Sequence, residues 1–219
     1  MSFAAAHTTL IPKSSKAARA LGVLLAVGFL AACANSSPPP PSGPVAATIT
    51  FAHKTPLALD VASVELVEPW RQPGTPPHIG HRNANSPPDI VRAWTRDRLR
   101  ASPGGPGAKD GTVLRVILQD GAVTRTALKV EEGVGGLFRD EADTQIDAVA
   151  AVDVEVMDPV AGRIGSVSVK VVGSRKILES ASINERDRVY FALMEEIAAS
   201  LNSALENGLN AELGFVIKR

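Results

Sequence analysis

Two histidines in the stretch HIGH are the first residues that could do chemistry. His78 and His81 form an H-x-x-H pair inside a segment rich in Pro, Gly and Asn, from Pro69 to Pro88. This spacing presents both imidazoles to one metal ion only if the loop turns, and closed metal sites usually take four ligands. The nearest carboxylate after the pair is Asp89. A metal-dependent or hydrolytic surface enzyme that uses this pair is an alternative to polar loop histidines.

Other catalytic patterns are missing from the sequence. A nucleophile needs a nearby base and an exposing turn, and no G-x-S-x-G elbow is present. The glycine-rich stretch ASPGGPGAKDG resembles a phosphate loop only superficially, because it lacks G-x-x-x-x-G-K-[ST] and Asp110 follows Lys109. We therefore predict that the protein is not an enzyme and needs no cofactor.

The single cysteine, Cys33, lies at the end of an apolar segment. Lys13, Lys16 and Arg19 precede that segment without any acidic residue, and residues 20–34 carry no charge. This layout is typical of a signal peptide. A spanning helix needs about 18–20 apolar residues, so a permanent membrane helix is the weaker interpretation.

The residues before the thiol carry a resemblance. Leu30, Ala31 and Ala32 lead directly into Cys33, and this LAAC resembles the lipobox of bacterial lipoproteins. The resemblance implies cleavage before Cys33, diacylglycerol on its thiol and acylation of the new amino terminus. It also implies the outer membrane, on its periplasmic face, because Ala34 replaces the Asp that tends to retain such proteins in the inner membrane. The alternative is a buried free cysteine.

The segment after Cys33 predicts a tether and then one domain. Residues 34–44, ANSSPPPPSGP, favour extended polyproline II with a reach of roughly 35 Å. We expect a signal peptide at 1–32, a lipidated cysteine and tether at 33–44, and a single periplasmic domain at 45–219. The leader holds three of the 23 basic residues, so 20 Lys and Arg face 23 Asp and Glu afterwards. This weakly acidic balance, without a basic run, argues against nucleic acid as a partner.

Hydrophobic periodicity predicts an α+β fold in the order β-α-β-β-β-α. Alternation in residues 49–66 slips once near Ala62 and Ser63, which indicates a bulge or a break between two strands. We expect about four strands in an antiparallel or mixed sheet, with two helices on one face and the other face wet. The residues that define these elements are Ile90, Val91, Trp94 and Leu99 in the first helix; Leu114, Val116 and Leu118, then Ile146 to Val156, then Val167, Val169 and Val171 in strands; and Tyr190 to Leu205 in the last helix.

The ends of the last helix follow from capping preferences. Ser182 or Asn184 can cap its start, Glu185 and Asp187 fall in the first turn, and Gly208 occupies a position suited to a C-terminal cap. We therefore expect the helix to end near Gly208.

The element order behind the lipobox and tether resembles two groups of small envelope lipoproteins. These are the lipopolysaccharide-assembly lipoprotein and the auxiliary lipoproteins of ABC-type lipid transporters. The resemblance spans roughly residues 46–213 and rests on topology. It implies a non-catalytic accessory protein held at the membrane by its lipid and docked to an envelope protein. A structural envelope lipoprotein without cargo is a further alternative.

One loop adds a candidate contact site. Leu137 and Phe138 lie among glycines and acidic residues in EEGVGGLFRDEAD, between two predicted strands. An exposed Leu-Phe pair at a hairpin tip would suit contact with a membrane or a partner. The alternative is that Phe138 folds back onto the edge of the domain.

Overall fold

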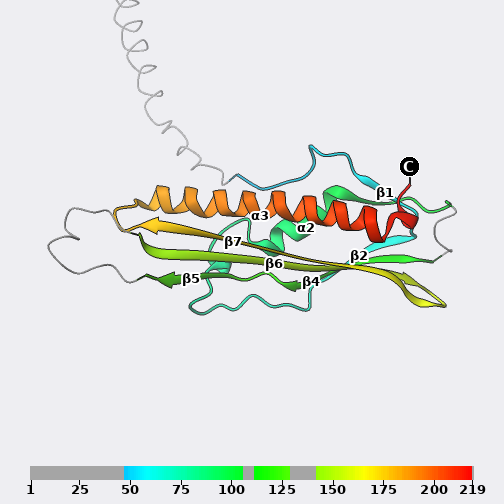
Figure 1. Cartoon of the computed structure of the whole chain (residues 1–219), viewed down its shortest axis with the longest axis horizontal. Helices are drawn as coiled ribbons and strands as arrows, with labels where there is room; N and C mark the ends of the chain where they lie inside the picture. The colour runs from blue at the N-terminus through cyan, green and yellow to red at the C-terminus, as the bar shows by residue number, and fades with distance from the viewer. Residues whose placement is uncertain (1–46, 106–110, 129–141, 219) are drawn as a thin grey trace, which may run out of the picture. The chain divides into compact units, whose positions relative to one another are not determined.

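The computed structural model describes residues 47–105, 111–128 and 142–218, which belong to one compact unit, Ala46–Arg219. The predicted signal peptide, tether and lipobox lie outside the described residues, as do Leu137 and Phe138. The central feature is a mixed five-stranded sheet, and two α-helices, one of them long, lie against it (Figure 1). Its strands are β2 (Ser63–Val67), β4 (Val113–Asp120), β5 (Val123–Ala127), β6 (Ala142–Asp158) and β7 (Gly162–Leu178).

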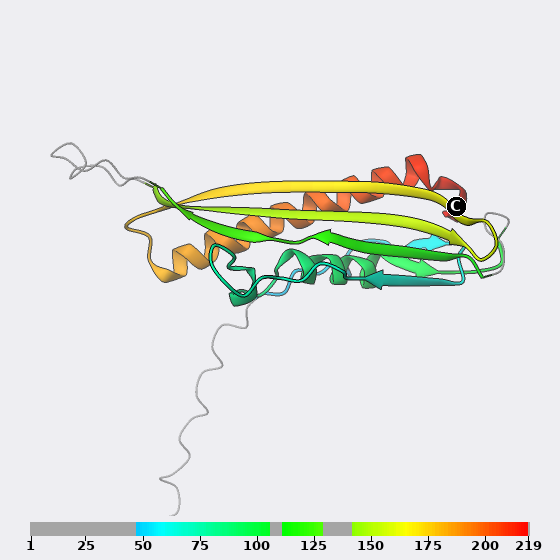
Figure 2. The ribbon, with the colours of Figure 1, turned by 90° about the horizontal axis from the view of Figure 1, so that it is seen from below.

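Strand β6 organises the sheet. It is 17 residues long and pairs antiparallel with β7 on one edge, from Ala142 opposite Leu178 to Asp158 opposite Gly162. On its other edge it pairs antiparallel with β4 and then β5, which follow one another along β6 and are separated at Gly121. Strand β2 lies parallel to β4 and makes the sheet mixed. The sheet therefore has about four strand positions across its width, as predicted (Figure 2).

The two faces of β6 have opposite character. Its residues alternate between buried and partly exposed along most of the strand, and Val152 and Val154 are completely buried. Asp147, Asp153 and Glu155 lie on the other face. Because side chains alternate across a strand, the valine face becomes the core and the acidic face stays wet. The predicted helix-covered face and wet face are confirmed.

Helix α2 (Pro87–Arg98) begins with a capping box, in which Ser86 and Asp89 exchange hydrogen bonds between side chain and backbone. It buries Ile90, Val91 and Trp94, as the sequence predicts. The prediction that Leu99 continues the helix is wrong. Leu99 adopts an extended backbone and begins β3.

A second, two-stranded sheet lies at the end of α2. It pairs β3 (Leu99–Ala101) in parallel with β1 (Leu57–Leu59), so the buried Leu99 side chain is placed by a strand. The chain leaves β1 and starts β2 only at Ser63. Of the two predicted explanations for the phase slip near Ala62, a bulge or a break, the structure shows the break between two short strands.

Helix α3 (Ile183–Glu212) is capped by Ser182, which accepts a hydrogen bond from the Glu185 amide while Glu185 bonds back to Ser182. The expectation that the helix ends at Gly208 is wrong, because it continues to Glu212. A Cβ at Gly208 would lie 2.5 Å from a methyl group of Val167 on β7. Glycine at this position allows close helix–strand packing.

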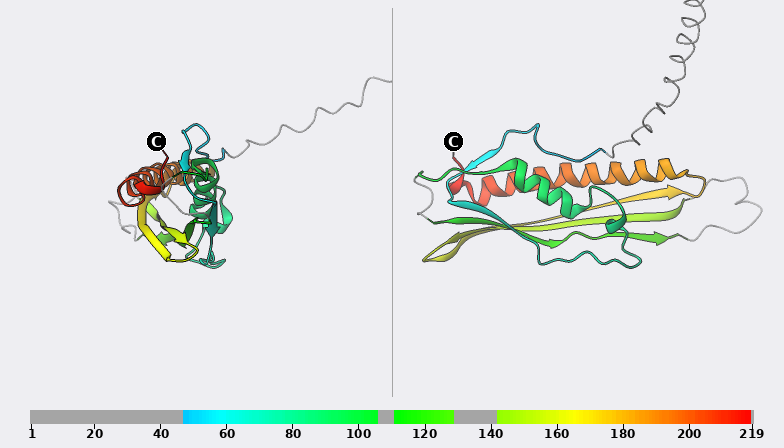
Figure 3. Two further views of the ribbon diagram at one scale, coloured as in Figure 1. Left: turned by 90° about the vertical axis from the view of Figure 1, so that its right-hand side faces the viewer. Right: turned by 180° about the vertical axis from the view of Figure 1, so that it is seen from behind.

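Both helices cover the same face of the sheet, as Figure 3 shows in its end-on view. They meet at a buried polar joint: Trp94 Nε1 and Arg98 Nε both donate to Asn202 Oδ1 on α3, at 3.3 and 3.1 Å. The Arg98 guanidinium also pairs with Glu206 at 2.8 Å. Because every polar group in a buried joint needs a partner, this network fixes how α2 and α3 cross.

The first described segment is attached to α2 by side chains. Asn85 bonds to the backbone of Ala47 and Ile49, at 2.7 and 2.8 Å, and Asp97 accepts hydrogen bonds from Thr50 and Phe51. Asn85 has a positive φ of 62°, which asparagine tolerates better than most residues. In the described part of the chain, no helix is long and apolar enough to cross a membrane.

Candidate functional site

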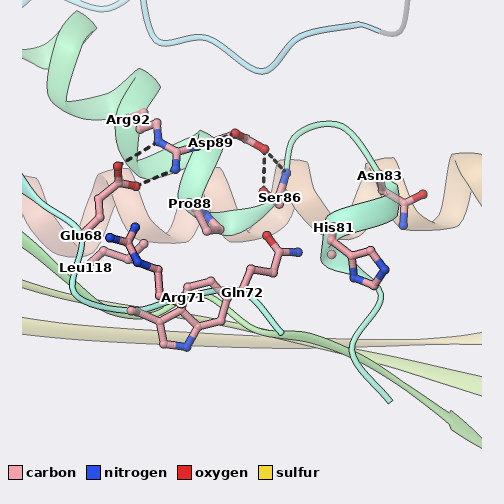
Figure 4. Close-up of a pocket in the computed structure, with 12 residues that line it drawn as sticks. Glu68, Arg71, Gln72, His81, Asn83, Ser86, Pro88, Asp89, Arg92 and Leu118 are labelled. Carbon is pink, nitrogen blue, oxygen red and sulfur yellow. Dashed lines mark hydrogen bonds and ion pairs between the residues drawn. The ribbon is translucent and has the colours of Figure 1, made fainter. Parts of the chain in front are cut away.

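A polar cleft of about 230 Å³ lies where the loop after β2 passes the start of α2 (Figure 4). The loop is held to β5 by two backbone hydrogen bonds, from Ile79 N to Val123 O and from Arg125 N to Pro77 O, each 2.9 Å. A 3-10 turn, η1 (Gly80–Arg82), then leads toward the cap of α2. The lining residues are Glu68, Trp70, Arg71, Gln72, Gly80, His81, Asn83, Ser86, Pro88, Asp89, Arg92 and Leu118.

The charged groups of the cleft are engaged with one another. Arg92 contacts both carboxylate oxygens of Glu68, at 2.8 and 3.1 Å, and one oxygen of Asp89 at 2.9 Å. The hydrogen bond to Glu68 raises the pKa of Arg92. The Arg92 guanidinium therefore engages both carboxylates of the cleft at once.

Ser86 carries the only hydroxyl group among the residues that line the cleft. Its Oγ donates to Asp89, which also accepts the Ser86 amide at 3.1 Å. The same serine carbonyl accepts the first helical hydrogen bond, from Ile90 N at 3.0 Å. This geometry is that of a helix cap, and the hydroxyl is not hydrogen-bonded to His81.

One amide in the cleft has no partner. Nε2 of Gln72 is buried and has no hydrogen-bond partner among the described residues. A Cβ added at Gly80 would lie only 2.2 Å from this nitrogen. The absence of a side chain at Gly80 therefore makes room for the Gln72 amide. Arg71 is exposed at the edge of the cleft. The cleft thus offers one cation and two amides, Gln72 and Asn83, for binding a small polar group.

The structure places the two predicted histidines in different settings. His78 lies in the extended segment that bridges to Thr124 on β5, and its buried Nδ1 has no partner among the described residues. His81 is exposed in η1 and lines the cleft, where its Nε2 accepts a hydrogen bond from Arg82 at 3.2 Å. Within the described ranges, no three His, Cys, Asp or Glu side chains are grouped to hold a metal ion. The pair therefore lacks a third ligand there.

A second cavity, of about 190 Å³, lies beside the start of α3. Its floor includes Ile146, Ile177 and Tyr190, and three arginines line it, Arg82, Arg125 and Arg186. Burial, and to a lesser extent the charge of Asp89, raises the pKa of Tyr190, whose hydroxyl has no partner among the described residues. Arg186 bonds to the carbonyl oxygens of residues 178, 179 and 181. That arginine therefore braces the turn between β7 and α3.

Sequence reasoning missed most of the cleft. Glu68 and Arg92 are 24 residues apart, and neither shows a pattern that would pair them. The SPPD stretch at 86–89 is a capping signal and could have placed Ser86 and Asp89. No sequence signal identifies the buried Gln72 amide.

The architecture defines a class: an α+β domain with two helices on one face of a mixed sheet. No family model and no curated protein matches the chain. Three similar solved structures are rare lipoprotein B from Shewanella oneidensis, a minor lipoprotein from Acinetobacter baumannii and an uncharacterized lipoprotein B from Nitrosomonas europaea.

These three structures share 13, 12 and 13% sequence identity with this chain, with TM-scores of 0.33, 0.34 and 0.35. The alignments cover 66, 75 and 74% of this chain and 92, 99 and 96% of the other chains. All three are named lipoproteins and come from Gram-negative bacteria. At these TM-scores the similarity says nothing about a shared role.

Proposed function

We propose that this chain is a lipid-anchored, non-catalytic accessory lipoprotein on the periplasmic face of the outer membrane, serving envelope assembly or lipid transport. The observation that carries the proposal is LAAC at residues 30–33, preceded by a basic, apolar leader and followed by a proline-rich tether. Burial of acyl chains contributes about 0.8 kcal/mol per CH₂, so two or more chains hold a globular domain at a bilayer. Cys33 is the proposed attachment point.

The chemistry of the cleft supports a role without catalysis. Its carboxylates, Glu68 and Asp89, are both bound by Arg92, and its only hydroxyl, on Ser86, serves as a helix cap. A protein that acts by docking needs a fixed surface and a position, and both can be supplied by a rigid domain on a tether.

Membrane fractionation tests the proposal. The full gene is expressed in a Gram-negative host, and the inner and outer membranes are separated on a sucrose gradient. We expect the unaltered protein in the outer membrane and Cys33→Ala away from it, either soluble or uncleaved in the inner membrane.

Ala34→Asp is the matched control, because it keeps the thiol and changes only the sorting residue. We expect this variant to stay lipidated and to move to the inner membrane. The proposal fails if Cys33→Ala fractionates like the unaltered protein, or if the unaltered protein is soluble.

A further inference from the structure

Strand β7 forms one edge of the sheet, opposite the edge formed by β2 (Figure 2). It pairs with β6 along its whole length, and within the described ranges no other strand pairs with its second edge. An unpaired edge presents a row of free backbone N–H and C=O groups, which is a template for one more strand. At 17 residues β7 is much longer than a typical edge strand.

Helix α3 lies along one face of β7, and the strand's second edge is unpaired within the described ranges. A Cβ at Gly165 would lie 2.6 Å from Leu213, so the C-terminal end of the helix packs closely over the start of β7. Farther along, a Cβ at Gly173 would contact Leu193 and Ile197 of the same helix, while Val172 beside it is 70% exposed. Residues 168–176 form the candidate edge, which we call the docking edge.

The two faces of the docking edge differ in a regular way. On the inner face, Val169 and Val171 pack against the core but stay partly exposed. On the outer face Val172 is 70% exposed, between Lys170 and Ser174. An added strand with apolar residues facing inward would complete the burial of the inner valines.

The charge of β7 is of one sign. From Gly162 to Leu178 it carries four basic residues and no acidic one. Arg163 pairs with Glu155 at 2.8 Å, and Arg175 pairs with Glu196. Lys170 and Lys176 are exposed and make no ion pair within the described ranges. Both lysines belong to the docking edge.

Geometry decides which charges an added strand meets. Such a strand would lie about 4.8 Å from β7 and about 10 Å from β6. Asp147 and Asp153 on β6 are therefore about one Debye length away at physiological salt, whereas Lys170 is directly adjacent. If the β7 strands of two copies of this chain paired antiparallel about Lys170, the two Lys170 side chains would lie directly opposite each other, and this like-charge pair is destabilising.

We propose that the docking edge binds an extended, acidic segment of an envelope partner protein by β-strand addition. The segment alternates apolar residues, facing Val169 and Val171, with carboxylates that face Lys170 and Lys176. Nine residues span about 30 Å of strand. This inference rests on the proposed accessory role, whose anchor is tested separately by fractionation.

The test uses the full chain extracted in detergent and two fluorescein-labelled nine-residue peptides. One peptide alternates Glu and Val, and the other alternates Lys and Val. Fluorescence anisotropy measures affinity, and hydrogen exchange maps amide protection. We expect the acidic peptide to bind at least tenfold more tightly than the basic one and to protect amides of residues 168–176.

Variants separate the edge from general charge. Lys170→Glu with Lys176→Glu should weaken the acidic peptide at least tenfold and strengthen the basic one. Lys54→Glu with Arg100→Glu makes the same change of net charge at exposed positions outside both β7 and the helix that packs on it, and should leave both affinities unchanged. All four sites are exposed, and thermal melts confirm that the variants fold.

Three results would overturn the proposal. The first is no binding, or equal binding of both peptides. The second is binding that leaves residues 168–176 unprotected. The third is slow hydrogen exchange of the β7 amides in the absence of peptide, if this protection is lost when the protein is diluted. The edge would then be paired with a second copy of this chain. If the unaltered protein fractionates with the outer membrane but does not bind the acidic peptide, the proposal for the docking edge is refuted and the proposed lipid anchor is not.

Discussion

Replacing Gly208 by alanine tests how closely α3 packs on the sheet. In an open helix this change stabilises the protein by about 1 kcal/mol, because glycine is a poor helix former. Here the new Cβ would lie 2.5 Å from Cγ2 of Val167. Non-bonded carbon atoms prefer a separation of about 3.5–4.0 Å. The helix and the strand must therefore move apart by about 1 Å to accept the new Cβ.

The size of the effect follows from what can move. Val167 is stiff at χ1, and its strand is paired with Val154 on β6. Overpacking of this kind costs about 1–3 kcal/mol. With about 2 kcal/mol for the clash and about 1 kcal/mol regained from helix propensity, Gly208→Ala should lower the free energy of unfolding by about 1 kcal/mol.

Urea denaturation of four proteins checks this value: the unaltered chain, Gly208→Ala, Val167→Ala and the double variant. In the Val167→Ala background the obstructing methyl is gone, so Gly208→Ala should stabilise by about 1 kcal/mol. The coupling between the two sites is then about 2 kcal/mol. If Gly208→Ala stabilises the protein with Val167 intact, the close contact and the reasoning from it are refuted.

Three further outcomes are expected. Arg98→Met should cost about 2 kcal/mol of unfolding free energy, because buried acceptors lose their donor, while Arg100→Met, at an exposed neighbour, should change it by less than about 0.5 kcal/mol; equal effects would contradict the polar joint. Burial acts to raise the pKa of Asp97, but hydrogen bonds from Arg96, Thr50 and Phe51 outweigh it and lower that pKa. The stabilisation by Asp97 is therefore complete above about pH 4 and is lost as pH falls through the lowered pKa. Asp97→Asn should flatten the acid limb of a stability–pH profile, and an unchanged limb would argue against these bonds. Replacing Leu137 and Phe138 with Ser should abolish membrane or partner association at unchanged stability if they form a contact tip, whereas a lowered melting temperature would place them in the core.

The sheet could be predicted because its signal is local. Alternating residues along β6 meet alternating environments, so the valine face and the acidic face are visible in the chain itself. The helices were recognisable for the same reason, from apolar residues at steps of three and four. The capping serine of α3 also follows from neighbouring residues.

The errors came from tertiary contacts. Leu99 has the spacing of a helical residue, but pairing of β3 with β1 makes it extended. Glycine is typical of a helix end, which suggested an end at Gly208. In the structure glycine is required there because Val167 of β7 packs too close to leave room for a Cβ. The Glu68–Arg92 pair joins a residue of the loop after β2 to helix α2, and the buried Asn202 interrupts an apolar stripe. None of these contacts leaves a periodic signal in the sequence.

The most direct test of the account is the mass of the amino-terminal peptide of the protein extracted from the envelope. We predict that the mature chain begins at Cys33 and carries diacylglycerol on the thiol with a third acyl chain on the amino group. A mature chain that begins elsewhere, or a free thiol at Cys33, would contradict the anchor and with it the proposed location.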